Sequence, residues 1–399
     1  MLIVQKYGGA TLADPEKIKS AARRISELKK KQIQIVAVVS AMGQTTNQLI
    51  ELAHNVSHSP NLREFDMLLS VGERISMSLV SIALNDLGHE AISFTGSQAG
   101  IFTDESHLGA MIKDVKAHRV QEALEKNKIV ILAGFQGVSP VTKEITTLGR
   151  GGSDTSAVAM AAFLNADRCE ILKDVSSIFT ADPKLVPQAK KITQMNYDHL
   201  LEMTFWGAKV LHYRSVELAK VKKVKLYVGP AHDHHHGESS DGTIIHEGIM
   251  FESSKPLAVN SHSKILEMTI QSDTTAQAFE MLFQAFQKSN IAVPQILNGF
   301  VQNKKTHVLV TAPSEILAAI EAMDFSKYPQ ISITNNKLCS VSLTCTGSTL
   351  NDTLVAVTKK LAESHIQPTY FIQSAMSLNY IVEQNHKDKT IQTLHSLIG

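Results

Sequence analysis

Short apolar blocks and longer stretches of helical spacing alternate along the first 250 residues. Blocks that are apolar almost throughout, as in strands covered on both faces, occupy residues 2–5, 33–40, 91–95, 128–135, 169–175 and 223–228, and the pattern ends near 242–246. Helical spacing follows Asp14 and Pro15, and it recurs over 65–88 as one helix or as two helices broken near Gly72. The alternation predicts an α/β fold, a three-layer sandwich with a mostly parallel central sheet.

Beyond about residue 260 the pattern changes to an order of strands and helices that nearly repeats itself. Strands are expected at 265–271, 291–300, 306–312 and 330–335, with helices at 275–289 and 314–323. The second copy has strands at 338–344, 367–373 and 377–383, with helices at 349–364 and 388–397. Two βαββαβ units predict α+β modules that bind ligands or pair subunits. Because the second copy ends at Gly399 without its last strand, we expect the copies to share elements.

Composition narrows the class of protein. A chain of 399 residues predicts two or three domains, and 39 basic against 38 acidic residues argue against nucleic acid as a partner. Three scattered cysteines, Cys169, Cys339 and Cys345, are typical of reduced thiols and not of a disulfide framework or a zinc site. No apolar run approaches the roughly 20 residues that span a bilayer, and no signal peptide is visible. A cytoplasmic protein without a membrane partner is therefore expected.

Four histidines lie close together in the polar segment 232–242, at His232, His234, His235 and His236. Such a cluster can hold a metal ion. An exposed loop is favoured instead, because no acidic or cysteine side chains stand at ligand spacing nearby. No protein metal site is predicted.

The segment 146–164, TTLGRGGSDTSAVAMAAFL, carries the strongest chemical signal. Its glycines let backbone N–H groups approach a charged ligand closely, and the planar fork of Arg150 suits a carboxylate or a phosphate. Ser153 and Asp154 are expected at the N-cap of the helix that follows. A glycine loop, a helix N-terminus and an arginine together predict a site for an anionic ligand.

Lys6 is a second candidate, because it ends the first strand beside Gly8 and Gly9. Its ammonium group would neutralise charge on a phosphoryl group, whereas the ordinary alternative is a lysine exposed to water at a strand end. The loop after the second strand, SAMGQTTN, is rich in hydroxyl groups. Loops at the carboxyl ends of parallel strands are where such folds bind ligands, so both features point to one edge of the sheet.

Eight segments resemble, in their order and spacing, the aspartokinases of the amino acid kinase superfamily. They are KYGGAT, VVSAMGQTTNQL, LLSVGERIS, SFTGSQAGI, AGFQGV, TTLGRGGSDTSA, the DV…FTADPKLVP stretch and GAKVLH. The resemblance is strong over 2–217, and beyond about 260 the repeats resemble the paired ACT domains of that family. It implies an amino acid kinase catalytic domain at 1–248, a linker at 249–262, and ACT-like regulatory domains at 263–335 and 336–399.

The resemblance implies an enzyme that phosphorylates the β-carboxylate of L-aspartate with ATP and Mg²⁺, the first step toward lysine, methionine and threonine. It also implies regulation by lysine or threonine and a homo-oligomer formed through the ACT-like domains. Two alternatives stay open: a kinase for another substrate, such as glutamate or a nucleoside monophosphate, and a non-catalytic amino acid sensor.

The roles of individual residues follow from the same resemblance. It makes Lys6 and Asp154 catalytic, Glu73 the partner of the substrate ammonium group, and Arg150 the partner of its α-carboxylate. Further substrate contacts are Ser40, Phe135, Ser153 and either Thr45 or Thr46, of which Thr46 is favoured. The expected ATP contacts are Lys6, Tyr7, Gly8, Gly9, Lys173, Asp174, Phe179, Lys184, Lys209 and Val210.

The chain departs from the family pattern at a few of these positions. Ala10 stands where the first motif usually has a hydroxyl, and Lys173 and Ser177 replace a threonine and a glycine of the nucleotide loop. Phe179 and Lys184 replace a tyrosine and an arginine, which are mild changes. The adenine and ribose contacts are the part of the prediction that these departures affect most.

Overall fold

The computed structural model describes residues 1–231, 242–248, 256–272, 274–289, 291–346 and 349–398. The chain divides into two compact units. The first comprises Met1–Phe179, Lys191–Thr204 and Lys209–Met250, and the second comprises Thr180–Lys190, Phe205–Ala208 and Phe251–Gly399. The histidine cluster at 232–236 lies outside the described residues.

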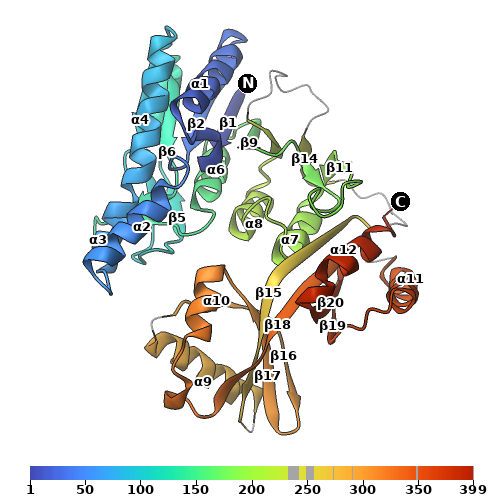
Figure 1. The fold of residues 1–399 in the computed structure, drawn as a ribbon. Helices are drawn as coiled ribbons and strands as arrows, with labels where there is room; N and C mark the ends of the chain where they lie inside the picture. Colours follow the sequence, from blue (N-terminus) through green and yellow to red (C-terminus); the bar gives the residue numbers. More distant parts are fainter. Residues whose placement is uncertain (232–241, 249–255, 273, 290, 347–348, 399) are drawn as a thin grey trace. The chain divides into compact units, whose positions relative to one another are not determined.

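An eight-stranded sheet of order β12-β14-β13-β9-β1-β2-β6-β3 forms the centre of the first unit (Figure 1). Its strands are β1 (Leu2–Tyr7), β2 (Gln34–Val39), β3 (Ala91–Phe94), β6 (Ile129–Ala133), β9 (Arg168–Lys173), β12 (Gln194–Met195), β13 (Leu226–Pro230) and β14 (Thr243–Ile245). All neighbouring strands run parallel except β13 and β14. The prediction of an α/β fold with a mostly parallel sheet is therefore confirmed.

Helices cover both faces of this sheet, which is why its central strands are apolar almost throughout. The helices are α1 (Pro15–Lys30), α2 (Thr45–Val56), α3 (Leu62–Leu69), α4 (Val71–Asp86), α5 (His118–Glu125), α6 (Gly152–Phe163), α7 (Tyr197–Phe205) and α8 (Tyr213–Lys222), with a 3-10 turn, η1 (Gly9–Leu12), after β1. One core cluster joins α1 and α4 to β1, β2 and β6. Helix α6 contacts β1, β2 and β9 and packs against α8.

The stretch 65–88 forms two helices, and the break between α3 and α4 falls at Ser70 instead of Gly72. By length and composition alone, Leu62–Asp86 is apolar enough to cross a membrane, contrary to the prediction that no segment approaches that length. Half of its most apolar window is buried inside the protein, as in a core helix. Buried polar side chains also lie within it, among them Asp66 and Glu73.

A second, four-stranded sheet of order β5-β4-β7-β8 lies beside the parallel sheet in the first unit and was not predicted. Its strands are β4 (Ile101–Thr103), β5 (Ile112–Val115), β7 (Gln136–Val138) and β8 (Ile145–Thr147). Strands of three or four residues with mixed polarity give no periodic signal, so the pattern could not reveal them. Strand β8 matters for function because the glycine loop follows it directly.

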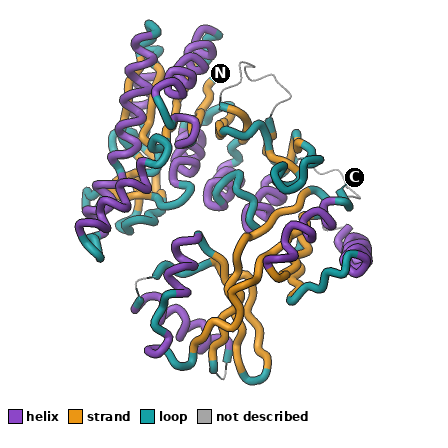
Figure 2. The backbone as a smooth tube through the Cα atoms, in the orientation of Figure 1, coloured by secondary structure: helices purple, strands orange, loops and turns teal. Residues whose placement is uncertain are grey.

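The second unit is built on a six-stranded antiparallel sheet of order β16-β17-β15-β18-β20-β19, drawn in orange in Figure 2. Its elements are β15 (Ala258–Ile270), α9 (Thr275–Lys288), β16 (Gln295–Gln302), β17 (Lys305–Thr311), α10 (Ser314–Glu321), β18 (Ile331–Thr344), α11 (Leu350–Glu363), β19 (Tyr370–Gln373), β20 (Ser377–Glu383) and α12 (Lys387–His395). The antiparallel sheet with its helices agrees with the ACT-like class that was predicted.

Two long strands join the repeats, which corrects the predicted element order. The strands expected at 330–335 and 338–344 are one strand, β18, and β15 begins at Ala258, so that residues 258–262 are strand and not linker. Strand β15 pairs with β18 from Ala258↔Thr344 to Ile270↔Ile331. The first part of β15 therefore lies beside the second repeat and completes its sheet. The domain boundaries at 263–335 and 336–399 stay a prediction.

One hairpin of the first unit has its tip in the second unit. Strands β10 (Ile178–Phe179) and β11 (Lys191–Ile192) pair in the first unit, whereas residues 180–190 between them belong to the second. Ala181 and Val186 are buried in the hydrophobic cluster of the second repeat. The backbone N–H of Val259 donates to the carbonyl of Thr180 at 2.7 Å, so the tip is fixed to β15.

Candidate active site

A cavity of about 460 Å³ opens at the carboxyl ends of β1 and β2. Nine residues predicted from the sequence line it: Lys6, Gly9, Ser40, Thr46, Glu73, Phe135, Arg150, Ser153 and Asp154. They come from segments that are far apart in the chain, and parallel strands bring them together because their carboxyl ends meet at one edge of the sheet. The remaining lining includes Ala41, Leu69, Leu108, Thr147 and Gly149.

Lys6 and Asp154 form a nearly buried ion pair at the base of this cavity. The ammonium nitrogen of Lys6 lies 2.7 Å from Oδ1 of Asp154, and about a tenth of each side chain is exposed. Burial opposes ionisation of Asp154, but the positive charges of Lys6 and Lys173 outweigh it and lower the pKa of the carboxyl group. Asp154 is therefore a carboxylate that holds Lys6 in place.

The glycine loop, residues 148–151, turns the chain sharply from β8 into α6. Gly149 and Gly151 have φ values of 71° and 70°, in the left-handed region that favours glycine. A Cβ on Gly151 would lie 2.1 Å from the Cβ of His212. Gly151 is itself the N-cap, so Ser153 and Asp154 lie within the first turn of α6 and are not the N-cap that the sequence predicted. Asp154 still benefits from the positive end of the helix dipole.

Glu73 lies in the first turn of α4 and presents an unpaired oxygen. Its residue is 3% exposed, Oε1 accepts a hydrogen bond from the N–H of Ala41 at 3.0 Å, and Oε2 is buried without a partner among the described residues. Burial raises the pKa of Glu73 to about 7, although the hydrogen bond from Ala41 opposes the shift. A buried carboxylate oxygen without a donor suits a ligand that carries an ammonium group.

The hydroxyl-rich loop and Phe135 form two further walls. Ser40 and Thr46 line the cavity, whereas Thr45 does not and lies near Gly72 instead. This placement agrees with the preference for Thr46. Phe135 has a φ of 67°, which is rare for a bulky residue, and such strain is concentrated at functional sites.

The predicted ATP contacts are spread more widely. The side chain of Tyr7 is fully buried, and its hydroxyl donates to Gln5 at 3.0 Å, so only its main chain can face a ligand. Gly8 borders the Lys6 ammonium, because a Cβ on Gly8 would lie 3.7 Å from it. The cavity lining includes none of the other candidates: Lys173, Asp174, Phe179, Lys184, Lys209 and Val210.

Lys173 is the last residue of β9, which pairs with β1, and Asp174 follows it; Lys209 and Val210 precede α8. Burial lowers the pKa of the Lys173 ammonium, and the like charge of Lys6 acts in the same direction against the pull of Asp154. Ser177 turns its hydroxyl inward to Thr243 at 2.9 Å. Lys184 lies in the second unit. The nucleotide role of all these residues stays a prediction.

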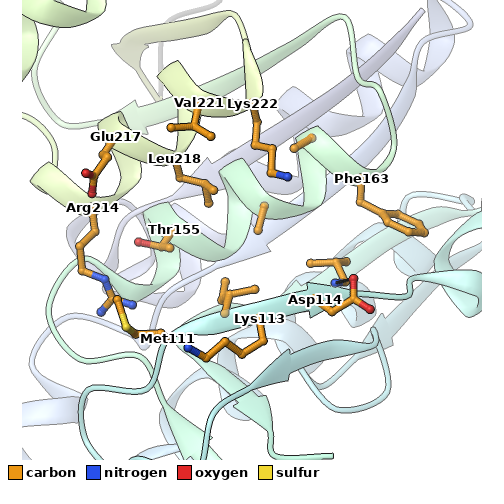
Figure 3. A pocket seen from close by; sticks show the side chains of 14 residues that line it. Met111, Lys113, Asp114, Thr155, Phe163, Arg214, Glu217, Leu218, Val221 and Lys222 are labelled. Atoms are coloured by element: carbon orange, nitrogen blue, oxygen red, sulfur yellow. Dashed lines mark hydrogen bonds between the residues drawn. The ribbon is translucent and has the colours of Figure 1, made fainter.

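Sequence reasoning missed the residues that hold the glycine loop. Arg214 of α8 donates to the carbonyl oxygens of Leu148 at 2.7 Å and Ala110 at 2.9 Å. It also lines a separate cavity of about 430 Å³ between α6 and α8 (Figure 3). That cavity contains none of the predicted site residues. The only signal for Arg214 was its position just after the GAKVLH motif.

The described part of the chain contains no group of three or more His, Cys, Asp or Glu side chains placed to hold a metal ion. The three cysteines are buried and form no disulfide.

The model of the amino acid kinase family matches residues 1–230, the part of the chain that contains this cavity. An aspartokinase of Mycolicibacterium smegmatis is 39% identical over 408 residues, which cover 100% of this chain and 96% of the relative. The chain belongs to the aspartokinases.

Two solved structures of E. coli aspartokinase III share the fold over 99% or more of both chains. The complex with aspartate and ADP superposes with a TM-score of 0.78 at 20% identity. The complex with lysine and aspartate gives a TM-score of 0.76 at 21% identity.

Replacing Glu73 by Gln should stabilise the unliganded protein at high pH. Folding raises the pKa of the Glu73 carboxyl group, so this group stabilises the fold only while it is protonated. The stabilisation is fully present below the pKa of the unfolded chain and is lost as the pH rises through the folded-state pKa of about 7. Thermal unfolding should therefore give a higher midpoint for Glu73→Gln than for the wild type at pH 8, and nearly equal midpoints at pH 5. Glu125→Gln, at an exposed position, serves as the control. A Glu73→Gln protein that is less stable at pH 8 contradicts the buried carboxylate.

Replacing Gly151 by Ala should disrupt the start of α6. The positive φ and the overlap with His212 together should cost about 2 kcal/mol or more, and displacing the loop by about 1 Å should lower kcat/KM roughly a hundredfold. Gly109→Ala is the matched control, because a Cβ there meets nothing within 4 Å. Equal activities of the two variants would show that the glycine loop tolerates a side chain.

Proposed function

We propose that this cavity transfers the γ-phosphoryl group of ATP to the β-carboxylate of L-aspartate, giving aspartyl phosphate and ADP. The observation that carries the proposal is the Lys6–Asp154 ion pair, which lies in the same cavity as Arg150 and Glu73, whose Oε2 has no partner among the described residues. An amino acid presents one ammonium and one carboxylate at its Cα, and these two residues supply the complementary charges.

Each wall of the cavity has a role in holding aspartate. Glu73 accepts the ammonium group through Oε2, and Arg150 binds the α-carboxylate with its planar fork. The hydroxyl groups of Ser40, Thr46 and Ser153 offer further hydrogen bonds, and the ring of Phe135 packs over the ligand. The β-carboxylate then points toward Lys6, because that is where the cavity holds its remaining cation.

The reaction requires charge neutralisation more than proton transfer. A β-carboxylate oxygen attacks the γ-phosphorus, the bond from that phosphorus to the ADP oxygen breaks, and no proton needs to move. Because both reactants are anionic, their repulsion is the main barrier. The Lys6 ammonium, fixed by Asp154, and the N–H groups of the glycine loop stabilise the negative charge of the transferring group.

ATP enters as its magnesium complex, in which Mg²⁺ neutralises the β- and γ-phosphates. Asp154 lines the cavity and Asp174 follows β9 outside that lining, so each carboxylate could supply only a single ligand to a cation carried mainly by the phosphates. We assign the nucleotide contacts to the main chain of 7–9 and to Lys173, Asp174, Phe179, Lys184, Lys209 and Val210. The ammonium of Lys173 adds a positive charge near Lys6 that the family's threonine lacks.

The second unit regulates this activity in our proposal, with lysine or threonine as the effector. E. coli aspartokinase III has been solved with lysine, which supports an amino acid effector for this chain. The hairpin tip at 180–190 supports coupling, because it follows the predicted nucleotide contact Phe179 directly and is packed into the core of the second unit. Edge strands β16 and β19 offer surfaces for a homo-oligomer, and the cytoplasm is the proposed location.

Removal of the Lys6 ammonium should abolish most of the activity. In Lys6→Ala, the kcat for aspartate-dependent ADP release should fall about 10²- to 10³-fold, because one preorganised positive charge at the transferring group is lost. Acyl phosphate trapped with hydroxylamine provides a second readout. Lys19→Ala, which removes an exposed lysine paired with Glu16, should behave like the wild type. Unchanged turnover in Lys6→Ala would refute the proposed chemistry.

The same assay distinguishes the alternatives. Faster turnover with glutamate or with a nucleoside monophosphate than with aspartate would indicate a kinase for another substrate. A wild-type protein that binds aspartate but gives no calorimetric signal with magnesium and ATP would indicate a sensor.

Loosening the hairpin tip should weaken regulation. Val186→Ala removes two methyl groups from a fully buried side chain in the tip and should cost about 2 kcal/mol of stability. Val357→Ala, in the same cluster but on α11 and also fully buried, should cost a similar amount. If the tip transmits the effector signal, the half-inhibiting concentration of lysine or threonine rises several-fold in Val186→Ala and stays within about twofold in Val357→Ala. Equal shifts in both variants contradict a role for the tip.

A further inference from the structure

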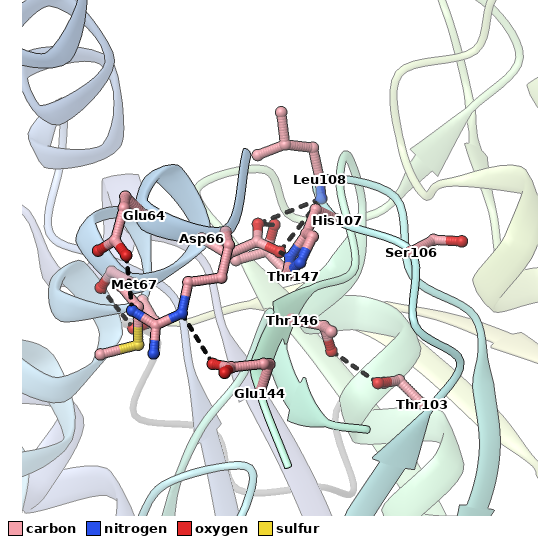
Figure 4. A network of polar contacts seen from close by, with 12 residues as sticks. Glu64, Asp66, Met67, Thr103, Ser106, His107, Leu108, Glu144, Thr146 and Thr147 are labelled. Atoms are coloured by element: carbon pink, nitrogen blue, oxygen red, sulfur yellow. Dashed lines mark hydrogen bonds and ion pairs between the residues drawn. The ribbon is translucent and has the colours of Figure 1, made fainter. Parts of the chain in front are cut away.

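The carboxylate of Asp66 is completely buried in α3 and is surrounded by donors (Figure 4). It accepts hydrogen bonds from the N–H of Leu108 at 3.1 Å and from the hydroxyl of Thr147 at 2.5 Å, and Nδ1 of His107 lies 2.6 Å away. Burying a carboxylate is costly unless it is fully hydrogen-bonded, so its partners must be held in fixed positions. Hydrogen bonds from Asp66 thus connect α3 to two other segments of the first unit, residues 107–108 and the end of β8 at Thr147.

Both of these segments are walls of the active-site cavity. Leu108 and Thr147 line it, and the N–H of Ala110 donates to the carbonyl of Thr147 at 2.9 Å. The carbonyl oxygen of Leu108 lies so close to Gly149 that a Cβ there would be 2.7 Å from it. Asp66 therefore fixes the base of the loop that carries Arg150.

The same carboxylate is connected to Glu73 through the helices. Only Ser70 separates α3 from α4, and Glu73 lies in the first turn of α4. The side-chain amide of Gln136 donates to the carbonyl of Ser70 at 2.9 Å, which holds the junction. A shift of Asp66 would therefore move the first turn of α4 as well as the glycine loop.

A second contact holds this loop, because Arg214 of α8 donates hydrogen bonds to the carbonyl oxygens of Leu148 and Ala110. The carboxylate of Asp66 on α3 and the guanidinium of Arg214 on α8 thus both hold the start of the glycine loop through hydrogen bonds. Of the two residues, only Asp66 lies on the helix that leads directly into α4 and Glu73.

We propose that Asp66 is a positioning residue that sets the separation between Glu73 and Arg150, and hence how well the cavity accepts the ammonium and α-carboxylate of its amino acid substrate. This inference rests on the proposed function, in which those two groups bind the two charged ends of aspartate. Asp66 does not touch the substrate and acts through Leu108 and Thr147.

The test uses two neighbouring threonines of β8 that face opposite ways. Thr147 bonds to Asp66, whereas Thr146 bonds to Thr103 at 2.6 Å, and both are fully buried. Thr147→Val and Thr146→Val each remove one buried hydroxyl hydrogen bond, so their general effects on stability should be similar. Only the first should raise the KM for aspartate, by about tenfold, with kcat and the KM for ATP within about threefold of the wild type.

Variants of Asp66 extend the series. Asp66→Asn keeps an oxygen acceptor and should resemble Thr147→Val, whereas Asp66→Ala leaves Leu108 and Thr147 without an acceptor and should raise the KM for aspartate further. If Asp66→Ala fails to fold, the threonine pair still decides the question. Parallel increases of both KM values, or equal effects of Thr146→Val and Thr147→Val, would overturn the proposal.

Hydrogen–deuterium exchange separates this inference from the proposed function. In Thr147→Val and Asp66→Asn, amides of 107–110 and 148–152 should exchange faster than in the wild type, and in Thr146→Val they should not. This result is expected even for a wild-type protein that does not phosphorylate aspartate. Unchanged exchange in these segments would overturn the positioning role, whereas inactivity of the wild type on aspartate would overturn only the proposed function.

Discussion

The ion pair between Lys6 and Asp154 is the interaction on which the site depends. In the proposed reaction two negatively charged reactants meet, and the pair keeps a cation in the cavity where they would do so. An ammonium group alone would lose much of its hydration there, and a carboxylate at 2.7 Å compensates for this loss. The pair joins the end of β1 to the first turn of α6, so the geometry of sheet and helix determines where the charge lies.

Around this pair, the first unit holds polar groups in position by burying them. Within the described part of the chain, one oxygen of Glu73 has no hydrogen-bond donor, because the N–H of Ala41 bonds only to the other. The glycine loop has no side chains to anchor it at positions 149 and 151, so Asp66 and Arg214 fix its base from elements on either side. A site that binds both ends of a small molecule needs such supports, since displacements of about 1 Å cost substantial affinity and rate.

The second unit connects to this chemistry through the chain itself. Residues 180–190 continue directly from β10, yet their apolar side chains complete the core of the second repeat. That repeat also takes the first part of β15 into its sheet, so neither repeat is complete without a strand that it shares with the other. In the proposed regulation, this segment is the route by which a change in the packing of the second unit would reach Phe179.

The sequence alone determined the parallel sheet, because apolar blocks such as 128–135 have to be covered on both faces, and it identified Lys6, Arg150 and Asp154 through glycines that fit no ordinary helix or strand. It could not reveal the short strands of the second sheet, the continuity of β18 through the exposed residues Asn336 and Lys337, or the contacts of Asp66 and Arg214. Those depend on partners such as Thr147 and Leu148, 81 and 66 residues away, and only the folded chain brings them together. Local sequence patterns indicate which face of a helix or strand is buried, whereas the tertiary structure determines which groups each buried side chain contacts.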